Sequence, residues 1–320
     1  MKANLYYNYA PDFVKYEEIE RPIVGENEVL IKVRAASVNP LDCVTRPMPY
    51  IFRLMFGLRK PKDARLGRDV AGQVEAVGNS VTRFKPGDNV FGVCRGAFAE
   101  YACASESKLV VKPDKVIFEQ AASLPVAGST ALQALRDKAK LRSGQKVLIN
   151  GAAGGVGTFA VQIARSFGAN VTAVCSTRNV DMVDSLGADR IIDYTKEDFT
   201  KGKQRYDLIF DCVGNHSLLA LKRLLNPDGM YLAVGASPEG RWIGPLARLL
   251  KTYLLSWFVK PKLALFLAAI TTDDLTILGT MTESGKLHPV IDRRYELRET
   301  TDAIRYLAER HARGKVVIVM

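Results

Sequence analysis

A glycine-rich stretch at residues 151–157 has the composition of a phosphate-binding turn. It follows the apolar run 146–150 and precedes a segment whose apolar residues share one face of a helix. Because glycine has no Cβ, the backbone can approach a pyrophosphate closely, and the first N–H groups of the following helix can bind it. The stretch therefore predicts a dinucleotide site, with a plain strand-to-helix connection as the alternative. The candidate cofactor-binding residues here are Gly151, Gly154, Gly155, Val156 and Gly157.

The residues that end the next strand-like run bear on the choice between NADPH and NADH. In dinucleotide-binding folds an acid at this place, roughly twenty residues after the glycines, accepts hydrogen bonds from the ribose of NAD. This chain has Ser176, Thr177 and Arg178 instead. Two hydroxyls can donate to a 2′-phosphate and a guanidinium can pair with it, so the pattern favours NADPH. The alternative is that Arg178 is a solvated residue at the start of the next helix.

Two patterns divide the chain. Up to about residue 120, short β-rich runs alternate with turn residues, which is typical of an antiparallel β domain. From about 123 to 270, strand-like runs alternate with helical stretches, which predicts a parallel sheet with crossover helices. One more helix and a closing strand are expected at the carboxyl end. A chain of 320 residues is long enough for two hydrophobic cores.

Composition narrows the class of protein. The 45 basic and 34 acidic residues give a formal charge of +11, but they are interspersed, so we expect an anion-binding site and no nucleic-acid partner. The five cysteines are odd in number and widely spaced, which favours free thiols. The amino-terminal residues lack the apolar core of a signal peptide, so a cytoplasmic protein is expected.

Several long motifs in order resemble the medium-chain dehydrogenase/reductase superfamily, most closely its zinc-free quinone oxidoreductase and enone reductase branch. They are "GRDVAGQVEAVGNSVTRFKPGDNVFG", "GAFAEY", "LPVAGSTALQAL", "GAAGGVG" and "HARGKVVIV". The resemblance implies an α/β fold in which a doubly wound Rossmann sheet is inserted in a GroES-like β-barrel domain. It implies a GroES-like domain over 1–122 and 273–320, with the Rossmann domain over 123–272.

The resemblance also permits a test for zinc. Zinc-using members have a cysteine shortly before the aspartate of the "NPLD" segment, and Gly-His-Glu where this chain has Gly-Arg-Asp. Asn39 and Arg68 take the places of that cysteine and that histidine, and a guanidinium cannot ligate zinc. We therefore expect no metal. Asp69 is expected to form a local ion pair with its neighbour Arg68.

Without a metal, the expected reaction is hydride transfer from NADPH to an electrophilic carbon of a quinone or an α,β-unsaturated carbonyl. Asn39 is the candidate for a polar contact to the substrate or the nicotinamide, and Tyr50 for a hydrogen bond to the carbonyl oxygen. A turn-capping asparagine and a packing aromatic are the respective alternatives. An NADP-dependent alcohol dehydrogenase and a non-catalytic NADPH-binding protein are the competing functions.

The resemblance implies further cofactor contacts by position. Tyr194 matches a tyrosine beside the adenosine phosphate, and Thr130 begins the Rossmann domain. The remaining contacts follow the fourth and fifth strands or belong to a returning loop near the carboxyl end; they are Val213, Gly214, Val234, Gly235, Ala236, His311 and Ala312.

Two stretches depart from the minimal family pattern, residues 49–62 and the apolar, base-edged residues 241–262. As a helix, 246–259 would be about 21 Å long, too short to cross a bilayer. An interfacial helix in peripheral contact with a membrane, a lid for a lipophilic substrate and a buried contact are the open alternatives. The family resemblance implies a homodimer.

Overall fold

The computed structural model describes residues 1–7, 14–42, 64–234 and 262–320. The chain divides into two compact units. The first comprises residues 1–129, 269–285 and 289–320, and the second comprises residues 130–268 and 286–288. The expectations for 49–62 and for 246–259 both concern residues outside the described ones.

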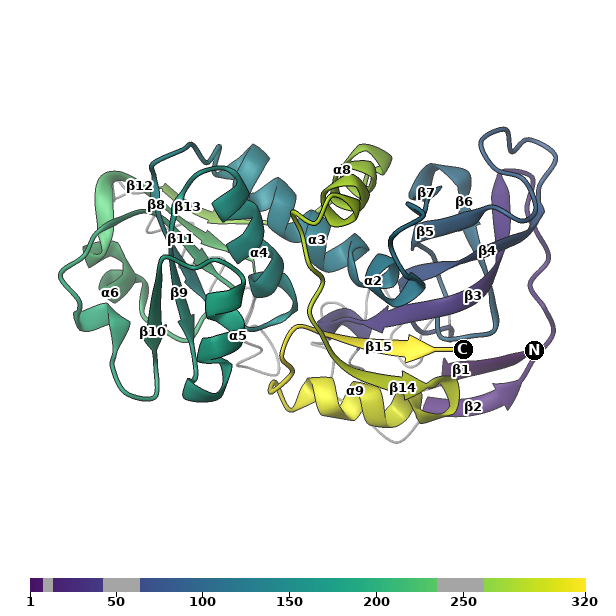
Figure 1. Cartoon of the computed structure of the whole chain (residues 1–320). Helices are drawn as coiled ribbons and strands as arrows, with labels where there is room; N and C mark the ends of the chain where they lie inside the picture. The colour runs from purple at the N-terminus through teal and green to yellow at the C-terminus, as the bar shows by residue number, and fades with distance from the viewer. Residues whose placement is uncertain (8–13, 43–63, 235–261) are drawn as a thin grey trace. The chain divides into compact units, whose positions relative to one another are not determined.

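A six-stranded parallel sheet in the order β10-β9-β8-β11-β12-β13 forms the centre of the second unit (Figure 1). Its strands are β8 (Lys146–Asn150), β9 (Asn170–Cys175), β10 (Arg190–Asp193), β11 (Tyr206–Asp211), β12 (Leu225–Ala233) and β13 (Lys262–Leu265). The strand order reverses at β8, and in such sheets ligands bind at the carboxyl ends of the strands beside the reversal. The predicted parallel sheet is confirmed.

Crossover helices flank this sheet. Figure 1 shows α4 and α5 on one side of it and α6 on the other. These helices are α4 (Gly155–Ser166), α5 (Val180–Ser185) and α6 (Leu218–Arg223). On α4 the predicted apolar face is buried at Phe159, Ala160 and Ile163, and the helix contacts β8 and β9. The helix is followed by Gly168, whose φ of +77° suits glycine and ends the helical run.

The first unit is built on a seven-stranded sheet in the order β14-β15-β3-β4-β5-β7, with β6 paired to β3, and on a β1-β2 ribbon. The strands are β1 (Lys2–Tyr6), β2 (Val14–Glu18), β3 (Glu28–Val38), β4 (Asp69–Val77), β5 (Asn89–Val93), β6 (Tyr101–Ser105), β7 (Leu109–Val111), β14 (Ile291–Glu296) and β15 (Lys315–Val319). The antiparallel pattern expected from the sequence holds except between β14 and β15, which pair in parallel.

Helices cover parts of the first unit. They are α2 (Phe118–Ser123), α3 (Pro125–Gln133), α8 (Thr272–Glu283) and α9 (Thr300–Ala308). Helix α3 begins in the first unit and ends in the second, since the division falls between Ser129 and Thr130. Helix α9 packs Ala303 and Ile304 into the core formed by the sheet, and its outer face is charged. The predicted carboxyl-terminal helix and closing strand are confirmed.

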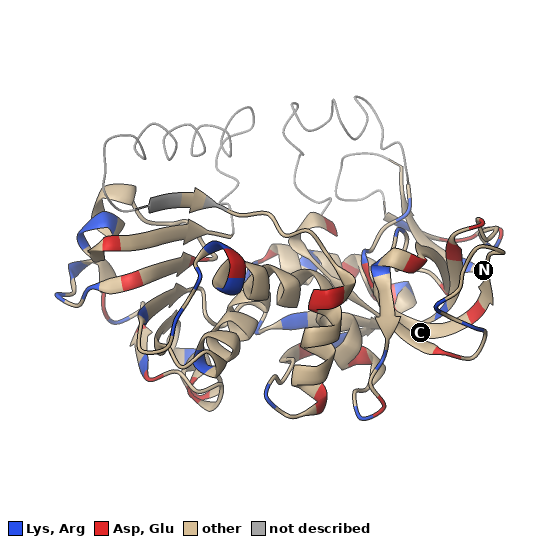
Figure 2. Ribbon diagram, turned by 90° about the horizontal axis from the view of Figure 1, so that it is seen from above, with Lys and Arg blue, Asp and Glu red and all other residues tan. Residues whose placement is uncertain are grey.

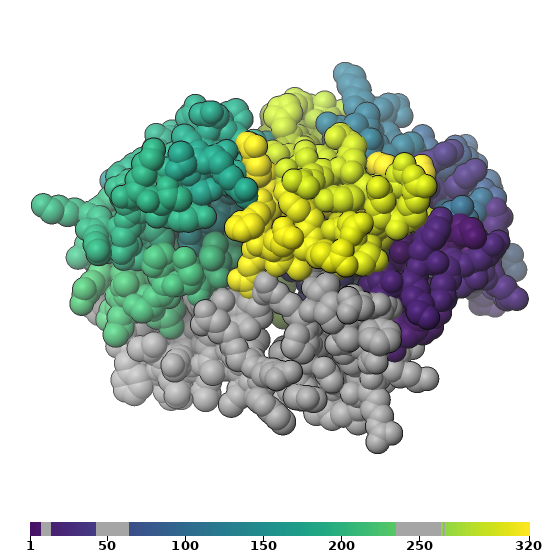
Figure 3. Space-filling model, turned by 90° about the horizontal axis from the view of Figure 1, so that it is seen from below, coloured from purple at the N-terminus to yellow at the C-terminus, as the bar shows by residue number. Residues whose placement is uncertain are grey.

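Residues from both ends of the chain build the first unit, and Figure 3 shows the two ends side by side on one face. The side-chain amide of Asn4 in β1 donates to the carbonyl of Leu297, 2.7 Å away, and to the hydroxyl of Thr300 at the start of α9, 3.0 Å away. These contacts join residues that are 293 and 296 positions apart in the sequence.

Basic and acidic residues are scattered among each other in both units (Figure 2), in agreement with the interspersed charges of the sequence. No helix within the described parts of the chain is both long enough and apolar enough to span a membrane.

Candidate functional site

The glycine-rich turn joins β8 to α4, and its glycines have different roles. Gly151 has a φ of +84°, which favours glycine. A Cβ on Gly157 would overlap the carbonyl oxygen of Gly151 and lie 2.8 Å from the Cα of Ala152, so the helix can approach the strand only with glycine here. A Cβ on Gly154 would meet the Gly151 oxygen at 3.5 Å, an ordinary contact. Gly151 and Gly157 therefore shape the turn, whereas Gly154 has room for a Cβ among the described residues.

The turn presents the start of α4 as an anion-binding end. The N–H of Thr158 donates to the carbonyl of Gly154, 2.9 Å away, which begins the intrahelical series. The N–H groups of Gly155, Val156 and Gly157 precede that series and have no acceptor within the helix. Together with the helix dipole, these donors suit a pyrophosphate.

A buried carboxylate, Asp211, organises the neighbouring strand end, and sequence reasoning did not identify it. One oxygen of Asp211 accepts from the amide of Asn150 at 2.9 Å and from the N–H groups of Val213 at 2.9 Å and Gly214 at 2.8 Å. The other accepts from the hydroxyl of Tyr231 at 2.8 Å. Asp211 thus fixes the loop that carries Val213 and Gly214 to the end of the strand before the glycine turn.

The three residues that follow β9 lie where the sequence placed them, at the carboxyl end of the sheet. The hydroxyl of Thr177 is within 2.6 Å of the carboxylate of Asp193, the last residue of β10, and donates to it. The hydroxyl of Ser176 accepts from the side-chain amide of Asn179 at 3.0 Å. Arg178 is exposed. A carboxylate is therefore present beside the predicted 2′-phosphate site, but it comes from β10, the adjacent strand, and not from β9.

Hydrogen bonds keep Asp193 ionised. The Thr177 hydroxyl contributes most, and the hydroxyl and N–H of Thr195 and the nearby Lys196 add to it; together they lower the pKa of Asp193 to about 2. The Asp193 side chain is 12% exposed. This arrangement could not be predicted from the sequence, because it depends on the pairing of β9 with β10 in the sheet.

Other predicted cofactor contacts of the second unit lie at strand ends or beside them. Tyr194 is 60% exposed, and its N–H donates to the carbonyl of Cys175 at 3.0 Å. Val234 follows β12, and its N–H donates to the carbonyl of Asp211 at 3.0 Å. Thr130 is half-buried in α3. Gly235 and Ala236 lie outside the described residues.

In the first unit, Asn39 belongs to a buried polar cluster. Its Oδ1 accepts from the ammonium of Lys315 at 2.8 Å, and its Nδ2 donates to the carboxylate of Asp69 at 3.0 Å. Lys315 and Asp69 also form an ion pair of 3.4 Å, with side chains only 3% and 0% exposed. Ser37 donates to the same carboxylate at 2.7 Å. The ion pair of Asp69 is therefore with Lys315, from the other end of the chain, and not with Arg68 as the sequence suggested.

This cluster connects three strands and a helix. Asn39 follows β3, Asp69 begins β4, and Lys315 begins β15. The second oxygen of Asp69 accepts from the N–H of Val126, in the first turn of α3, at 3.1 Å. Asn39 is 2% exposed, so its amide serves the cluster, and its contact to a substrate stays a prediction.

Asp42 lies beside this cluster and accepts a hydrogen bond of 2.8 Å from the backbone N–H of Asn39. Burial raises the pKa of Asp42 to about 7, and the negative charge of Asp69 adds to the shift; the Asn39 N–H and the positive charges of Lys315 and Arg68 oppose it.

The other predicted residues of the first unit are less informative. His311 is exposed, and Ala312 is half-buried against the core. Tyr50 lies outside the described residues.

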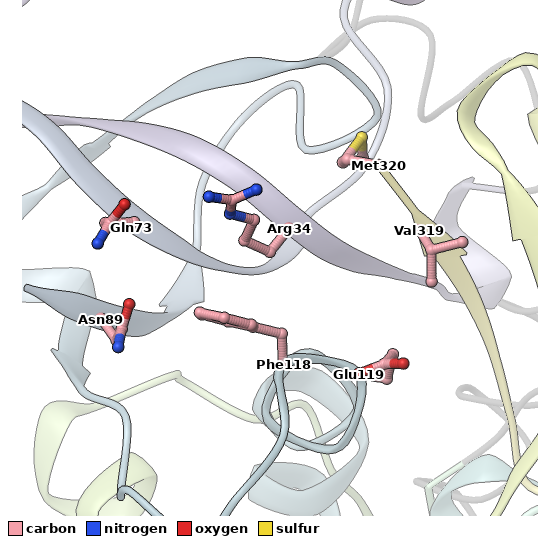
Figure 4. A pocket seen from close by; sticks show the side chains of 7 residues that line it. All are labelled: Arg34, Gln73, Asn89, Phe118, Glu119, Val319 and Met320. Atoms are coloured by element: carbon pink, nitrogen blue, oxygen red, sulfur yellow. The ribbon is translucent and has the colours of Figure 1, made fainter. Parts of the chain in front are cut away.

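An open surface pocket lies elsewhere on the first unit. Figure 4 shows the residues that line it: Arg34, Gln73, Asn89, Phe118, Glu119, Val319 and Met320. Val319 ends β15, which starts at Lys315, so the pocket and the buried cluster lie at opposite ends of that strand, roughly 13 Å apart. The pocket contains no residue predicted from the sequence to bind cofactor or substrate.

Two known families match parts of the chain. The family described as "Alcohol dehydrogenase GroES-like domain" matches residues 25–114, and that described as "Zinc-binding dehydrogenase" matches residues 186–318. The first match, with the observed sheets, confirms the expected fold class.

Individual proteins are similar over the full length. The "Chloroplast envelope quinone oxidoreductase homolog" of Arabidopsis thaliana is 32% identical, with 99% of this chain and 98% of the relative aligned. The "NADPH-dependent alkenal/one oxidoreductase, chloroplastic" of the same plant is 35% identical, with 99% and 79% aligned. The solved quinone oxidoreductase from Coxiella burnetii superposes with a TM-score of 0.86 at 32% identity, covering 100% of this chain and 99% of that one.

Because one matched family carries zinc in its description, we asked whether the described residues suit that metal. They contain no group of three or more His, Cys, Asp or Glu side chains that could hold an ion. In the cluster around Asn39, the carboxylate of Asp69 is paired with the buried ammonium of Lys315, and the positive charge of Lys315 also acts on Asp42. The described residues of this cluster do not fit zinc.

Proposed function

The chain belongs to the medium-chain dehydrogenase/reductase superfamily, in its quinone oxidoreductase branch, and on that premise we propose that it reduces quinones or α,β-unsaturated carbonyls with NADPH. The observation that carries the proposal is the turn from Gly151 to Gly157, in which Gly157 has no room for a Cβ. The turn leads into α4, and the first N–H groups of a helix have no acceptor within it. The names of the relatives support the same acceptor class. The nicotinamide cofactor supplies the hydride when it is bound.

The residues of this chain bind the cofactor and orient it. The N–H groups at the start of α4 bind the pyrophosphate, and Asp211 holds the Val213–Gly214 loop in place beside them. Arg178 pairs with the 2′-phosphate. A quinone or a conjugated carbonyl accepts hydride without a Lewis acid, because the charge moves to its oxygen, where a hydrogen-bond donor or solvent can supply the proton. The chemistry of the described residues around Asn39, which pair an ammonium with a carboxylate, agrees with an acceptor of this kind.

The test is NADPH oxidation on protein dialysed against a chelator, with a panel of a quinone, an enal, an enone and a saturated aldehyde. We expect turnover with the first three acceptors and none with the saturated aldehyde. Turnover of the saturated aldehyde alone, or activity only after addition of a stoichiometric divalent ion, would instead favour an alcohol dehydrogenase. Tight NADPH binding without turnover of any acceptor would favour a non-catalytic binding protein.

A further inference from the structure

The carboxylate of Asp193 lies at the same sheet edge as the residues expected to bind the 2′-phosphate. In the parallel pairing of β10 with β9, Asp193 is opposite Cys175, and Ser176, Thr177 and Arg178 follow directly. Neighbouring strands are about 4.8 Å apart, so the charge of Asp193 is close to this stretch. The contact of 2.6 Å between Thr177 Oγ1 and Asp193 Oδ2 joins the two strand ends directly.

The protons of two hydroxyl groups are used by this carboxylate. Thr177 donates to one oxygen of Asp193 at 2.6 Å, and Thr195 donates to the other at 2.7 Å. The two hydroxyl oxygens are 2.8 Å from each other. A hydroxyl has one proton, and the protons of Thr177 and Thr195 are used within this group of three side chains, by Asp193 or by the other hydroxyl. The two residues therefore offer lone pairs to a ligand. Lone pairs do not bind a phosphate.

Positive charge on the same edge comes from Arg178 and Lys196. The Lys196 ammonium is 3.5 Å from Asp193 Oδ2, and its side chain is 71% exposed. An exposed pair of this kind holds its lysine only weakly. The carboxyl-terminal edge of β9 and β10 therefore has two cationic side chains and one fixed carboxylate near the expected position of the 2′-substituent of the adenosine ribose.

We propose that Asp193 is a specificity-determining residue for the cofactor: its carboxylate weakens binding of a 2′-phosphate and leaves binding of an unphosphorylated ribose nearly unchanged. The proposal rests on the proposed function, since it concerns the same dinucleotide site. NADPH is then preferred because the attraction of the 2′-phosphate to Arg178 and Lys196 is stronger than its repulsion by Asp193. The hydroxyls of Thr177 and Thr195 do not contribute as donors.

The decisive variant is Asp193→Asn, which keeps the shape and one acceptor oxygen but removes the charge. The affinities of the full chain for NADP⁺, NAD⁺, 2′,5′-ADP and 5′-AMP are measured by calorimetry. We expect NADP⁺ and 2′,5′-ADP to bind about three- to tenfold more tightly to the variant, with NAD⁺ and 5′-AMP within about twofold of the wild type. The gain in NADP⁺ affinity should shrink as salt is raised, because exposed charges are screened.

Asp198→Asn is the matched control. Asp198 accepts from the N–H of Thr200 at 2.9 Å and from its hydroxyl at 2.7 Å, as Asp193 does from Thr195, and it lies in the same connection between β10 and β11. Among the described residues its hydrogen bonds are to Thr200 and not to Thr177. The control carries the same charge change and the same local hydrogen bonds, so it should leave the ratio of NADP⁺ to NAD⁺ affinity unchanged.

Thr177→Val tests the use of the hydroxyl protons independently. Its ratio of NADP⁺ to NAD⁺ affinity should stay within about twofold of the wild type, because Thr177 has no proton to give to a phosphate. A loss of NADP⁺ affinity as large as that of Arg178→Ala, or equal gains for Asp193→Asn and Asp198→Asn, would overturn the assignment to Asp193. Failure of the wild type to bind either dinucleotide would instead overturn the proposed function.

Discussion

The ammonium of Lys315 and the Oδ1 of Asn39 are 2.8 Å apart inside the first unit, and this hydrogen bond fixes which way the Asn39 amide points. The amide nitrogen is directed to Asp69, 3.0 Å away. The side chain of Lys315, which is 3% exposed, thus contacts both the amide of Asn39 and the carboxylate of Asp69. The position that sequence reasoning assigned to substrate contact is held from the opposite end of the chain.

Loss of Lys315 should destabilise the protein strongly. In Lys315→Met the Asp69 carboxylate stays buried without its cation, and we expect the free energy of unfolding in urea to fall by about 3–5 kcal/mol. Adding Asp69→Asn should recover part of that loss, since the unpaired charge is gone. Lys2→Met is the control: Lys2 forms a 2.9 Å ion pair with Glu18, but both side chains are exposed, so little change is expected. Equal effects of the two lysine variants would contradict this account.

Stability should decrease with rising pH because of Asp42. Its pKa is about 7 in the folded protein against an ordinary value of 3.8, so the folded state holds the proton over a range in which the unfolded state has released it. The contribution of Asp42 is therefore complete below the unfolded value and is lost as pH rises towards 7, at up to about 1.4 kcal/mol per pH unit. In Asp42→Asn this slope should disappear from urea titrations between pH 4 and 7. If the free energy of unfolding of the variant and of the wild type changed in parallel with pH, Asp42 would not be the buried carboxyl that keeps its proton in the folded state.

The two glycines at 154 and 157 should respond differently to alanine. Gly157→Ala forces a methyl group against the Gly151 carbonyl and should lower the thermal midpoint clearly and abolish dinucleotide binding. Gly154→Ala has room for its methyl group and should keep a midpoint near that of the wild type, because the nearest described atom would be 3.5 Å away. Its dinucleotide affinity should fall, because the methyl group adds bulk to the turn at which the pyrophosphate is expected to bind. Equal midpoints for the two variants would refute the division of roles.

Arg178→Ala should change the choice of cofactor. Loss of a charge-assisted contact to the 2′-phosphate should raise KM for NADPH about tenfold or more and leave KM for NADH nearly unchanged. Arg190→Ala is a suitable control, because that exposed arginine is bound to Gln204 at 2.9 Å and starts β10 at the other end of the strand. An equal rise of KM for NADPH and NADH in Arg178→Ala would contradict the assignment of the 2′-phosphate to this residue.

Local features of the fold could be predicted from the sequence. The glycine turn, the strand before it and the apolar face of α4 depend on neighbouring residues, and the structure has all three where the pattern indicated. Strand β14 was missed because its sequence, IDRRYE, is charged and lacks the apolar residues of a buried strand. Its parallel pairing with β15 follows from α9, which crosses from one strand to the other.

Contacts between distant residues could not be predicted. Asp193 meets Thr177 only because β10 lies next to β9 in register, and Asp211 acquires its role from Asn150 and Tyr231 on the two adjacent strands. Lys315 and Asn39 are separated by 276 positions in the sequence. No spacing rule relates such residues. The site residues chosen from the sequence stay predictions, and the groups that hold them in place could not be identified from the sequence.

The construction of the first unit from both ends of the chain has a consequence for biosynthesis. Residues 130–268 form nearly the whole second unit and can fold as soon as they have left the ribosome. The first unit must wait, because β3 lacks its neighbour β15 until residues 315–319 have been made. In the interval we expect the edge of β3 to lack its partner strand, and an unpaired strand edge is a surface at which chains aggregate and chaperones bind.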